Sequence, residues 1–236
     1  MPFPQNKYDD YSSRNKIHGS VMDTTPYRDA LIDILKGITE AYYLMVNPQY
    51  SKLPPNDEDF ITAKLYEDFL DDDKFRHQFN LTDYTFELEP AAIKNYKQVG
   101  YKDIQVRVNN RIPYFESTKS AYVIECKRLD GLAKNGLNKK YIKNGIKRFV
   151  DELYTEQNLH KKSAMLGYIV APMDIDQNIA YINDLIDTMP NLNTIQKLIL
   201  YDFETTFKHS YHSKHMSIYG RNIDIYHLML DLSSKI

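Results

Sequence analysis

The stretch "AYVIECKRLDG", residues 121–131, is the most informative part of this chain. It opens with the apolar run from Ala121 to Ile124, which is typical of a buried β-strand. Glu125 and Lys127 follow on a shared face, because the side chains of a strand alternate between the two sides of a sheet. The question is why an acidic and a basic side chain lie together at the end of a buried strand.

The composition is that of an ordinary globular protein, since 42% of the 236 residues are hydrophobic, 26% are charged and the formal net charge is −2. The length is sufficient for one large domain. The single cysteine, Cys126, excludes an internal disulfide framework and a zinc site built on several cysteines. Because the N-terminus has no apolar leader and no apolar run reaches about 18 residues, we expect a cytoplasmic protein without a membrane partner.

Two helices are expected near the N-terminus, after a polar stretch, residues 1–25, that is typical of a flexible arm. Apolar residues three and four positions apart follow from Pro26 and predict an amphipathic helix. A second helix is predicted over 57–71, with Asn56 as its cap and Phe60 among the side chains that face the core.

Alternating or continuous apolar patterns then predict a series of strands. These strands are expected at residues 83–90, 101–108, 120–128 and 163–172, with two more in 198–215 and 222–232. Further helices are expected at 139–156 and at roughly 175–188. Because a helix separates the third strand from the fourth, that connection is a crossover and at least one pair of strands is parallel. Residues 26–236 are therefore predicted to form a single α/β domain.

The second predicted strand brings another acid toward Glu125. Alternation places Asp103, Gln105 and Arg107 on one face of that strand. If the second and third strands pair as a hairpin, Asp103 lies near Glu125 in space. Hard cations such as Mg²⁺ take oxygen ligands, and these two carboxylates with the backbone carbonyl of Cys126 would supply part of such a shell.

A metal held by these acids beside a lysine would suit the hydrolysis of a phosphodiester bond. It would bind a phosphate oxygen and lower the pKa of a coordinated water, which creates a nucleophile. Lys127 would orient or deprotonate that water and counter the charge that grows on the phosphate. The plain alternative is that the charged residues merely solvate the edge of the sheet, because an acid followed at a distance by an E-x-K triplet is a permissive pattern.

Three segments, "GYKDIQV" (100–106), "AYVIECKRL" (121–129) and "KKYIKNGIKRFVDELY" (139–154), together resemble the PD-(D/E)XK nuclease superfamily, which has the restriction-endonuclease-like fold. The resemblance covers roughly residues 57–172. It implies an α-β-β-β-α-β core in which a central mixed sheet is flanked by helices. The rest of the chain would add helices at the N-terminus and a β extension over residues 173–236.

The resemblance also assigns roles to the charged residues. By position in the motif, Asp103 matches the Asp of the superfamily, Glu125 its second acid and Lys127 its lysine. Lys102 stands where the name-giving proline would be, which lowers the specificity of the match. The implied cofactor is Mg²⁺, for which Mn²⁺ would substitute.

Further ligands are implied as well, because a first-helix acid often supplements such a site. Glu58 is the candidate and Glu67 the second choice, while the first strand offers Glu87 and Glu89. The implied activity is metal-dependent endonuclease cleavage of DNA. The helix pattern and the C-terminal segment also resemble uncharacterised nuclease-like proteins of bacterial genome-defence neighbourhoods, which implies defence against foreign DNA.

A basic run supports binding of nucleic acid. Between Lys127 and Arg148 only Asp130 is acidic. The candidates for contacts with DNA phosphates are Lys139, Lys140, Lys143, Lys147 and Arg148. The alternative is a solvated helix face, which is the commoner role of a lysine-rich helix. The acid-rich stretch 57–73 would repel DNA, so most of it is expected to point away from a substrate groove.

The C-terminal histidines His209, His212 and His215 are three residues apart. On a helix this spacing would suit zinc, but the segment is predicted as strand and turn, where such residues fall on opposite faces. A basic loop that contacts phosphate or lies on the substrate side is the preferred interpretation, and the resemblance implies His215 as its contacting residue because it matches an S-x-H pattern.

Two other functions remain open at this point. One is a catalytically silent protein of the nuclease fold that binds nucleic acid or a partner subunit, and the other is an RNA-directed nuclease effector. A homodimer is expected if both strands of a duplex are cut, and a partner protein from a defence system is a further expectation.

Overall fold

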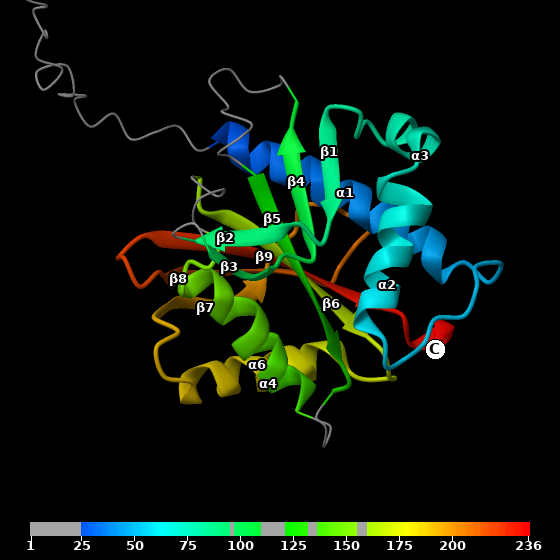
Figure 1. Ribbon diagram of the computed structural model, residues 1–236. Helices are drawn as coiled ribbons and strands as arrows, with labels where there is room; N and C mark the ends of the chain where they lie inside the picture. The colour runs from blue at the N-terminus through cyan, green and yellow to red at the C-terminus, as the bar shows by residue number, and fades with distance from the viewer. Residues whose placement is uncertain (1–24, 95–96, 110–120, 132–135, 155–159) are drawn as a thin grey trace, which may run out of the picture.

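The computed structural model describes residues 25–94, 97–109, 121–131, 136–154 and 160–236 (Figure 1). The expected N-terminal arm, residues 1–25, lies outside these described residues except for its last position.

A seven-stranded mixed sheet forms the centre of the molecule, in the order β1-β4-β5-β6-β9-β8-β7. Its strands are β1 (Tyr84–Leu88), β4 (Ile104–Val108), β5 (Ala121–Leu129), β6 (Lys162–Ile169), β7 (Thr194–Leu200), β8 (Ser210–Met216) and β9 (Asn222–Asp231). The pairs β5–β6 and β6–β9 are parallel, and the other neighbouring pairs are antiparallel. The predicted α/β class and the predicted parallel pair across the helical crossover are confirmed.

Helices pack on both faces of this sheet over two separate hydrophobic cores, so the fold has three layers. One face carries α1 (Thr25–Val46), α2 (Glu58–Leu65), its π-helical continuation η2 (Tyr66–Leu70) and α3 (Asp73–Gln78). The other carries α4 (Leu137–Tyr141), the π-helical turn η3 (Ile142–Ile146), α5 (Lys147–Val150) and α6 (Ile175–Thr188). A short 3-10 turn, η5 (Ser233–Lys235), follows β9.

Strand alternation assigns the charged residues of β5 to one of these faces. Ile124 and Cys126 belong to the core beneath α1 and α2. Val123 belongs to the opposite core, beneath α4 to α6. Because side chains two positions apart share a face, Glu125 and Lys127 lie on the side covered by α4 and α5.

The second helix differs from the prediction at its beginning. The helix begins at Glu58, and Asp57 caps it by accepting a hydrogen bond on its side chain from the backbone N of Phe60, at 2.9 Å. The predicted cap, Asn56, lies one residue too early. Phe60 is 43% exposed rather than buried, because its side chain lies on the outer face of the helix with the charged residues. The neighbouring Ile61 lies on the buried face.

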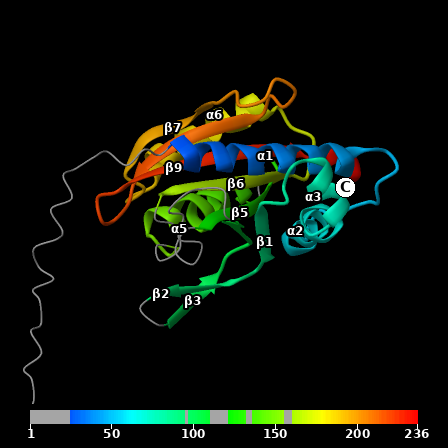
Figure 2. The same ribbon diagram turned by 90° about the horizontal axis from the view of Figure 1, so that it is seen from above.

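The second predicted strand is wrong at its start, because β4 begins at Ile104. The residues before it form a separate antiparallel hairpin, β2 (Ala91–Lys94) and β3 (Lys97–Tyr101), which projects away from the main sheet (Figure 2). This hairpin is inserted between β1 and β4, which pair with each other. The hairpin was not predicted, because its segments AAIK and KQVGY do not alternate apolar and polar residues as β1 and β4 do.

The C-terminal part also contains one strand more than predicted. Residues 198–215 were expected as one strand, but β7 ends at Leu200 and β8 begins at Ser210. The polar stretch between them breaks the alternation and allows β8 to fold back on β7. Within the described ranges, no helix combines the length and the apolar character that a membrane span requires.

Candidate functional site

The antiparallel pairing of β4 with β5 brings Asp103 to the charged end of β5. Ile104 is opposite Ile124 in this register, so Asp103, one residue before β4, lies beside the residues that follow Ile124. The Asp103 carboxylate accepts a hydrogen bond from the backbone N of Cys126 at 2.6 Å. The backbone of Asp103 is fixed as well, because its carbonyl accepts from the N of Glu89 at 3.0 Å. The predicted approach of positions 103 and 125 is confirmed.

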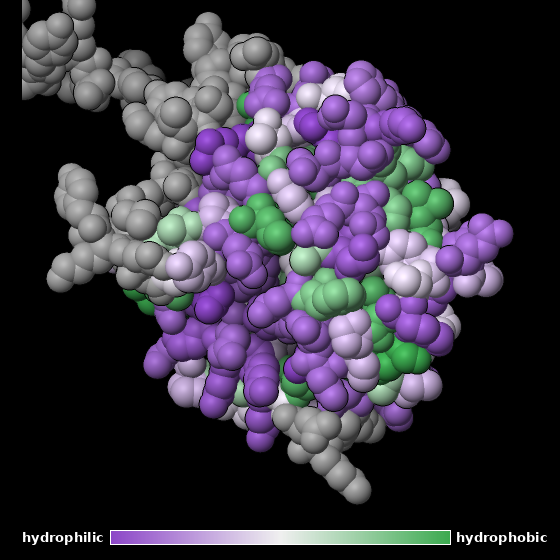
Figure 3. All heavy atoms as spheres, turned by 45° about the vertical axis from the view of Figure 1, so that its right-hand side comes forward, coloured by the Kyte–Doolittle hydropathy of each residue, from purple (hydrophilic) through white to green (hydrophobic). Residues whose placement is uncertain are grey.

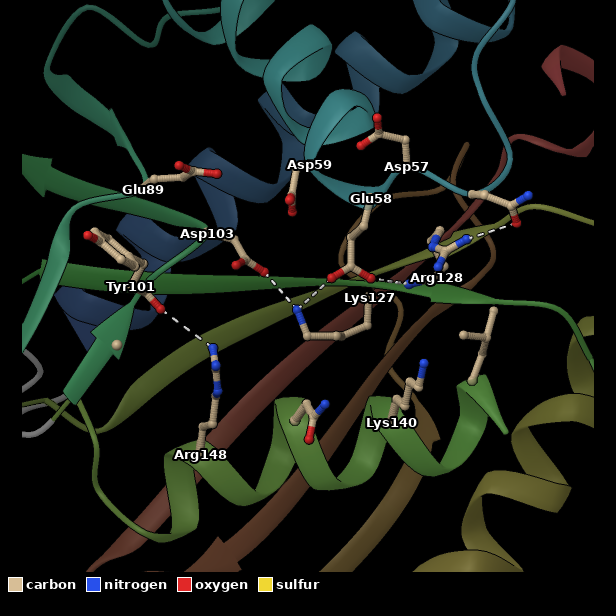
Figure 4. Close-up of a pocket in the computed structure, with 14 residues that line it drawn as sticks. Asp57, Glu58, Asp59, Glu89, Tyr101, Asp103, Lys127, Arg128, Lys140 and Arg148 are labelled. Atoms are coloured by element: carbon tan, nitrogen blue, oxygen red, sulfur yellow. Dashed lines mark hydrogen bonds and ion pairs between the residues drawn. The ribbon is translucent and has the colours of Figure 1, made fainter. Parts of the chain in front are cut away.

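The ammonium group of Lys127 lies at the centre of the charged residues (Figure 4). Its Nζ is 2.9 Å from Glu58 Oε1, 3.0 Å from Asp103 Oδ2 and 3.7 Å from Glu125 Oε2. It also donates a short hydrogen bond to the backbone carbonyl of Cys126. Three carboxylates and one carbonyl, from three segments distant in the sequence, therefore converge on one positive charge.

Glu58 enters this cluster from the first turn of α2, as expected. Its second oxygen, Oε2, accepts from the backbone N of Arg128 at 2.8 Å, which ties the helix to the end of β5. The other candidate acids do not converge on Lys127. Glu67 is exposed on η2, Glu87 pairs with Arg107 at 3.1 Å, and Glu89 is an exposed residue at the rim of the cleft described below.

Glu125 is fully buried, with 0% of its surface exposed. Its Oε1 accepts a hydrogen bond from the hydroxyl of Tyr154, and its Oε2 lies 3.1 Å from Arg148 Nη1. Burial, reinforced by the nearby Asp103 carboxylate, raises the pKa of Glu125 to about 7, although Lys127, Arg148 and the Tyr154 hydroxyl oppose this shift.

The pKa of Lys127 is raised above its ordinary value. Burial lowers this pKa, but the negative charges of Asp103, Glu125 and Glu58 outweigh burial and favour the ammonium form. The lysine is therefore a charged partner for the carboxylates.

The donor set suits a hard cation, because carboxylate and carbonyl oxygens are the ligands that Mg²⁺ takes in proteins. Glu58, Asp103 and the Cys126 carbonyl already surround a single cationic group. In the described part of the chain, however, no group of three or more His, Cys, Asp or Glu side chains is arranged as a ready metal site. The two observations agree if the Lys127 ammonium occupies the point where a cation would bind, so that the lysine must withdraw to admit one.

The cluster opens into a cleft of about 620 Å³ between α2, the base of the β2–β3 hairpin and the α4–α5 segment. Figure 4 shows Asp57, Asp59 and Glu89 around it in addition to the residues that contact Lys127. Asp57 and Asp59 of the acid-rich stretch therefore face the groove together with Glu58, because α2 begins at the cleft. In the space-filling view, hydrophilic residues cover most of the visible surface, with smaller hydrophobic patches between them (Figure 3).

The lysine-rich helical segment does not form one basic surface. Lys140 and Arg148 line the cleft, while Lys143 and Lys147 line a separate apolar depression beside Met189. Lys139 is exposed. Arg148 is engaged by Glu125, and Lys147 pairs with Asp151 at 2.7 Å. The predicted set of phosphate contacts is thus split between two faces.

The prediction that His215 contacts phosphate is wrong, because this residue is fully buried. The alternation of β8 points it inward, where it hydrogen-bonds with Ser213 at 3.0 Å and with Thr194 at 3.1 Å. Ser213 also bonds to His227 at 2.8 Å, and His227 bonds to Tyr141 at 2.8 Å. Burial lowers the pKa of His215 to about 4 and that of His227 well below its ordinary value, so this internal chain of polar groups is neutral.

Arg148 and Tyr154 are the site residues whose roles were not predicted. Arg148 was expected to contact DNA, but its guanidinium bonds to Glu125, to the Tyr154 hydroxyl and to the backbone carbonyl of Tyr101. A buried carboxylate such as Glu125 requires hydrogen-bond donors. The sequence pattern therefore implies such partners for Glu125 but does not identify Arg148 and Tyr154.

Neither a family model, nor a curated protein, nor a solved structure matches this chain. What the site does is therefore inferred from its own geometry and chemistry.

Proposed function

We propose that this protein is a metal-dependent endonuclease of the PD-(D/E)XK type that hydrolyses phosphodiester bonds of DNA. The observation that carries the proposal is the convergence of Asp103, Glu125 and Lys127, which are the three positions of the motif. The contact of Glu58 with the same ammonium supports it further, because a first-helix acid is what the resemblance implies.

The order of elements is compatible with the restriction-endonuclease-like core. One helix (α2), three strands (β1, β4, β5), a helical segment (α4 to α5) and a parallel strand (β6) follow one another along the chain. The strands β9, β8 and β7 then extend the same sheet on the side of β6, and α6 packs on one of its faces. The proposed site lies where β4 and β5 meet α2.

The residues have distinct proposed roles. Asp103, Glu125 and the Cys126 carbonyl would hold Mg²⁺ or Mn²⁺, with Glu58 as a further ligand. When bound there, the metal supplies a Lewis acid that polarises a phosphate oxygen and acidifies a water. Lys127 would orient that water and counter the negative charge that develops on the phosphate. Arg148 and Tyr154 fix the Glu125 carboxylate through their hydrogen bonds.

A catalytically silent protein of the same fold, which binds nucleic acid or a partner subunit, is the second candidate. It is favoured by the Lys127 ammonium at the centre of the cluster and by the lack of a ready metal group in the residues that the structure describes. The complete set of two acids and a lysine favours the enzyme, because a copy that has lost activity is expected to have lost one of them. Defence against foreign DNA is proposed on the resemblance alone.

The test is incubation with duplex DNA, single-stranded DNA and RNA in Mg²⁺, in Mn²⁺ and in EDTA. We expect cleavage of DNA that requires the metal, that disappears in Asp103→Asn and that falls about 10²–10⁴-fold in Lys127→Met. Glu67→Gln, an exposed acid of η2 outside the cleft, is the matched control and should cleave normally. Cleavage in EDTA would contradict the proposal, binding without any cleavage would favour the silent protein, and cleavage of RNA alone would identify an RNA-directed nuclease.

A further inference from the structure

One large aromatic side chain stands exposed at the cleft. Tyr101, the last residue of β3, is 57% exposed and lines the cleft together with Asp103. Its backbone is held at this position because its carbonyl accepts a hydrogen bond from Arg148 Nη1 at 3.5 Å (Figure 4). In the described part of the chain, its hydroxyl has no hydrogen-bond partner, so neither packing nor polar contacts explain the ring.

The hairpin places this ring within reach of the carboxylate cluster. Tyr101 precedes Asp103 by two residues, so their Cα atoms are at most about 7.6 Å apart. A nucleotide whose phosphate lies at Lys127 therefore has its base within reach of the tyrosine ring. The hairpin forms one wall of the cleft through Gly100 and Tyr101 and projects beyond the main sheet (Figure 2).

The charges of the cleft do not provide a track for a duplex. The cleft-lining cations are Lys127, Arg128, Lys140 and Arg148. Three of them are engaged: Lys127 and Arg148 by carboxylates, and Arg128 by the carbonyl of Pro55 at 2.8 Å. Among the described residues, Lys140 is the lining cation without a bonded partner.

Acidic side chains in the cleft also disfavour the binding of a duplex. Asp57, Asp59 and Glu89 also line the cleft, while Lys143 and Lys147 face elsewhere. A protein that follows a duplex neutralises several phosphates with free lysines and arginines, and this cleft offers few. Stacking of a base on an aromatic ring is the other source of affinity for nucleic acid, and it requires no basic track.

We infer that the cleft binds an unpaired nucleotide, in a single strand or at a frayed end, whose base stacks on Tyr101. The inference rests on the proposed function and specifies its substrate. In an intact duplex each base is stacked between its neighbours, so a duplex must be opened before Tyr101 can contact a base face.

The test measures kcat/KM in Mg²⁺ for a single-stranded oligonucleotide, for its duplex, and for strands that carry an abasic residue at each position near the cut. We expect the single strand to be preferred. Tyr101→Leu should lower kcat/KM on the single strand by about 5- to 150-fold, and Tyr101→Phe should retain it. An abasic residue beside the cut should impair the native protein and cause no further loss in Tyr101→Leu, because the two changes remove the same contact.

Tyr219→Leu is the matched control, since this tyrosine is 59% exposed but belongs to the turn between β8 and β9. The inference is overturned if the duplex is cut as well as the single strand, or if Tyr101→Leu behaves like Tyr219→Leu while cleavage persists. Cleavage that persists without these preferences refutes this inference alone. Absence of cleavage on every substrate would refute the proposed function and this inference together.

Discussion

Replacing Lys127 with methionine removes the positive charge at the centre of the cluster while keeping most of the side-chain volume. The change leaves Glu58, Asp103 and Glu125 without their shared partner, which was 2.9, 3.0 and 3.7 Å away. Breaking a buried ion pair by removing one partner costs about 3–5 kcal/mol. Since the side chains of Glu58 and Asp103 are 26% and 24% exposed, we expect the lower end, about 3 kcal/mol of the free energy of unfolding in EDTA.

The same variant should bind divalent metal more tightly, because the metal no longer has to displace the ammonium. Each hydrogen bond to a charged group contributes about 1.5–3 kcal/mol, so losing this competition should raise the affinity for Mn²⁺ at least about tenfold. Urea unfolding in EDTA and calorimetric titration with Mn²⁺ measure the two effects, and metal at about 100 times its Kd should restore roughly 2.7 kcal/mol.

Lys140→Met is the control, because Lys140 is exposed at the same cleft. Its unfolding free energy should change by less than about 0.5 kcal/mol. The reasoning fails if Lys127→Met is as stable as the native protein in EDTA, or if its affinity for Mn²⁺ is unchanged or lower.

Three further predictions concern the surroundings of the site. Tyr154→Phe removes the hydroxyl that donates to Glu125 and should lower the free energy of unfolding by about 1.5–3 kcal/mol in urea titrations. The depressed pKa of His227 makes the native state bind fewer protons than the unfolded chain below about pH 6.5, so acidification should destabilise the protein. In urea titrations, His227→Gln should reduce the slope of the unfolding free energy against pH, between pH 6 and pH 5, by up to about 1.4 kcal/mol per pH unit. Lys140→Glu should weaken oligonucleotide binding and flatten its salt dependence in anisotropy titrations, whereas Lys143→Glu, on the separate depression, should change neither.

The strand pattern of the sequence was sufficient to predict the centre of the site. The alternation in β5 separates Cys126 from Glu125 and Lys127, and hairpin pairing of β4 with β5 follows from two adjacent strand patterns. These local rules predicted that Asp103 approaches Glu125. The Glu58 contact was implied by the resemblance, and the structure bears out the proximity.

The failures concern features that depend on tertiary packing. Helical periodicity identified the stripe that contains Lys140, Lys143 and Arg148, but it does not say which lysines face the cleft. His215 was expected to contact phosphate from a basic loop because it matches an S-x-H pattern of the resemblance, whereas β8 is an internal strand paired on both edges. β7, which was not predicted as a separate strand, pairs with β8 and places Thr194 opposite this histidine.

A crystal structure of the protein soaked in Mn²⁺, with the metal located by its anomalous scattering, tests the central claim most directly. We predict a single strong peak coordinated by the carboxylates of Asp103 and Glu125 and by the Cys126 carbonyl, with the Lys127 ammonium moved off Glu58 and Asp103. A cluster in which Lys127 keeps both contacts at saturating Mn²⁺, with no metal among these oxygens, would contradict it.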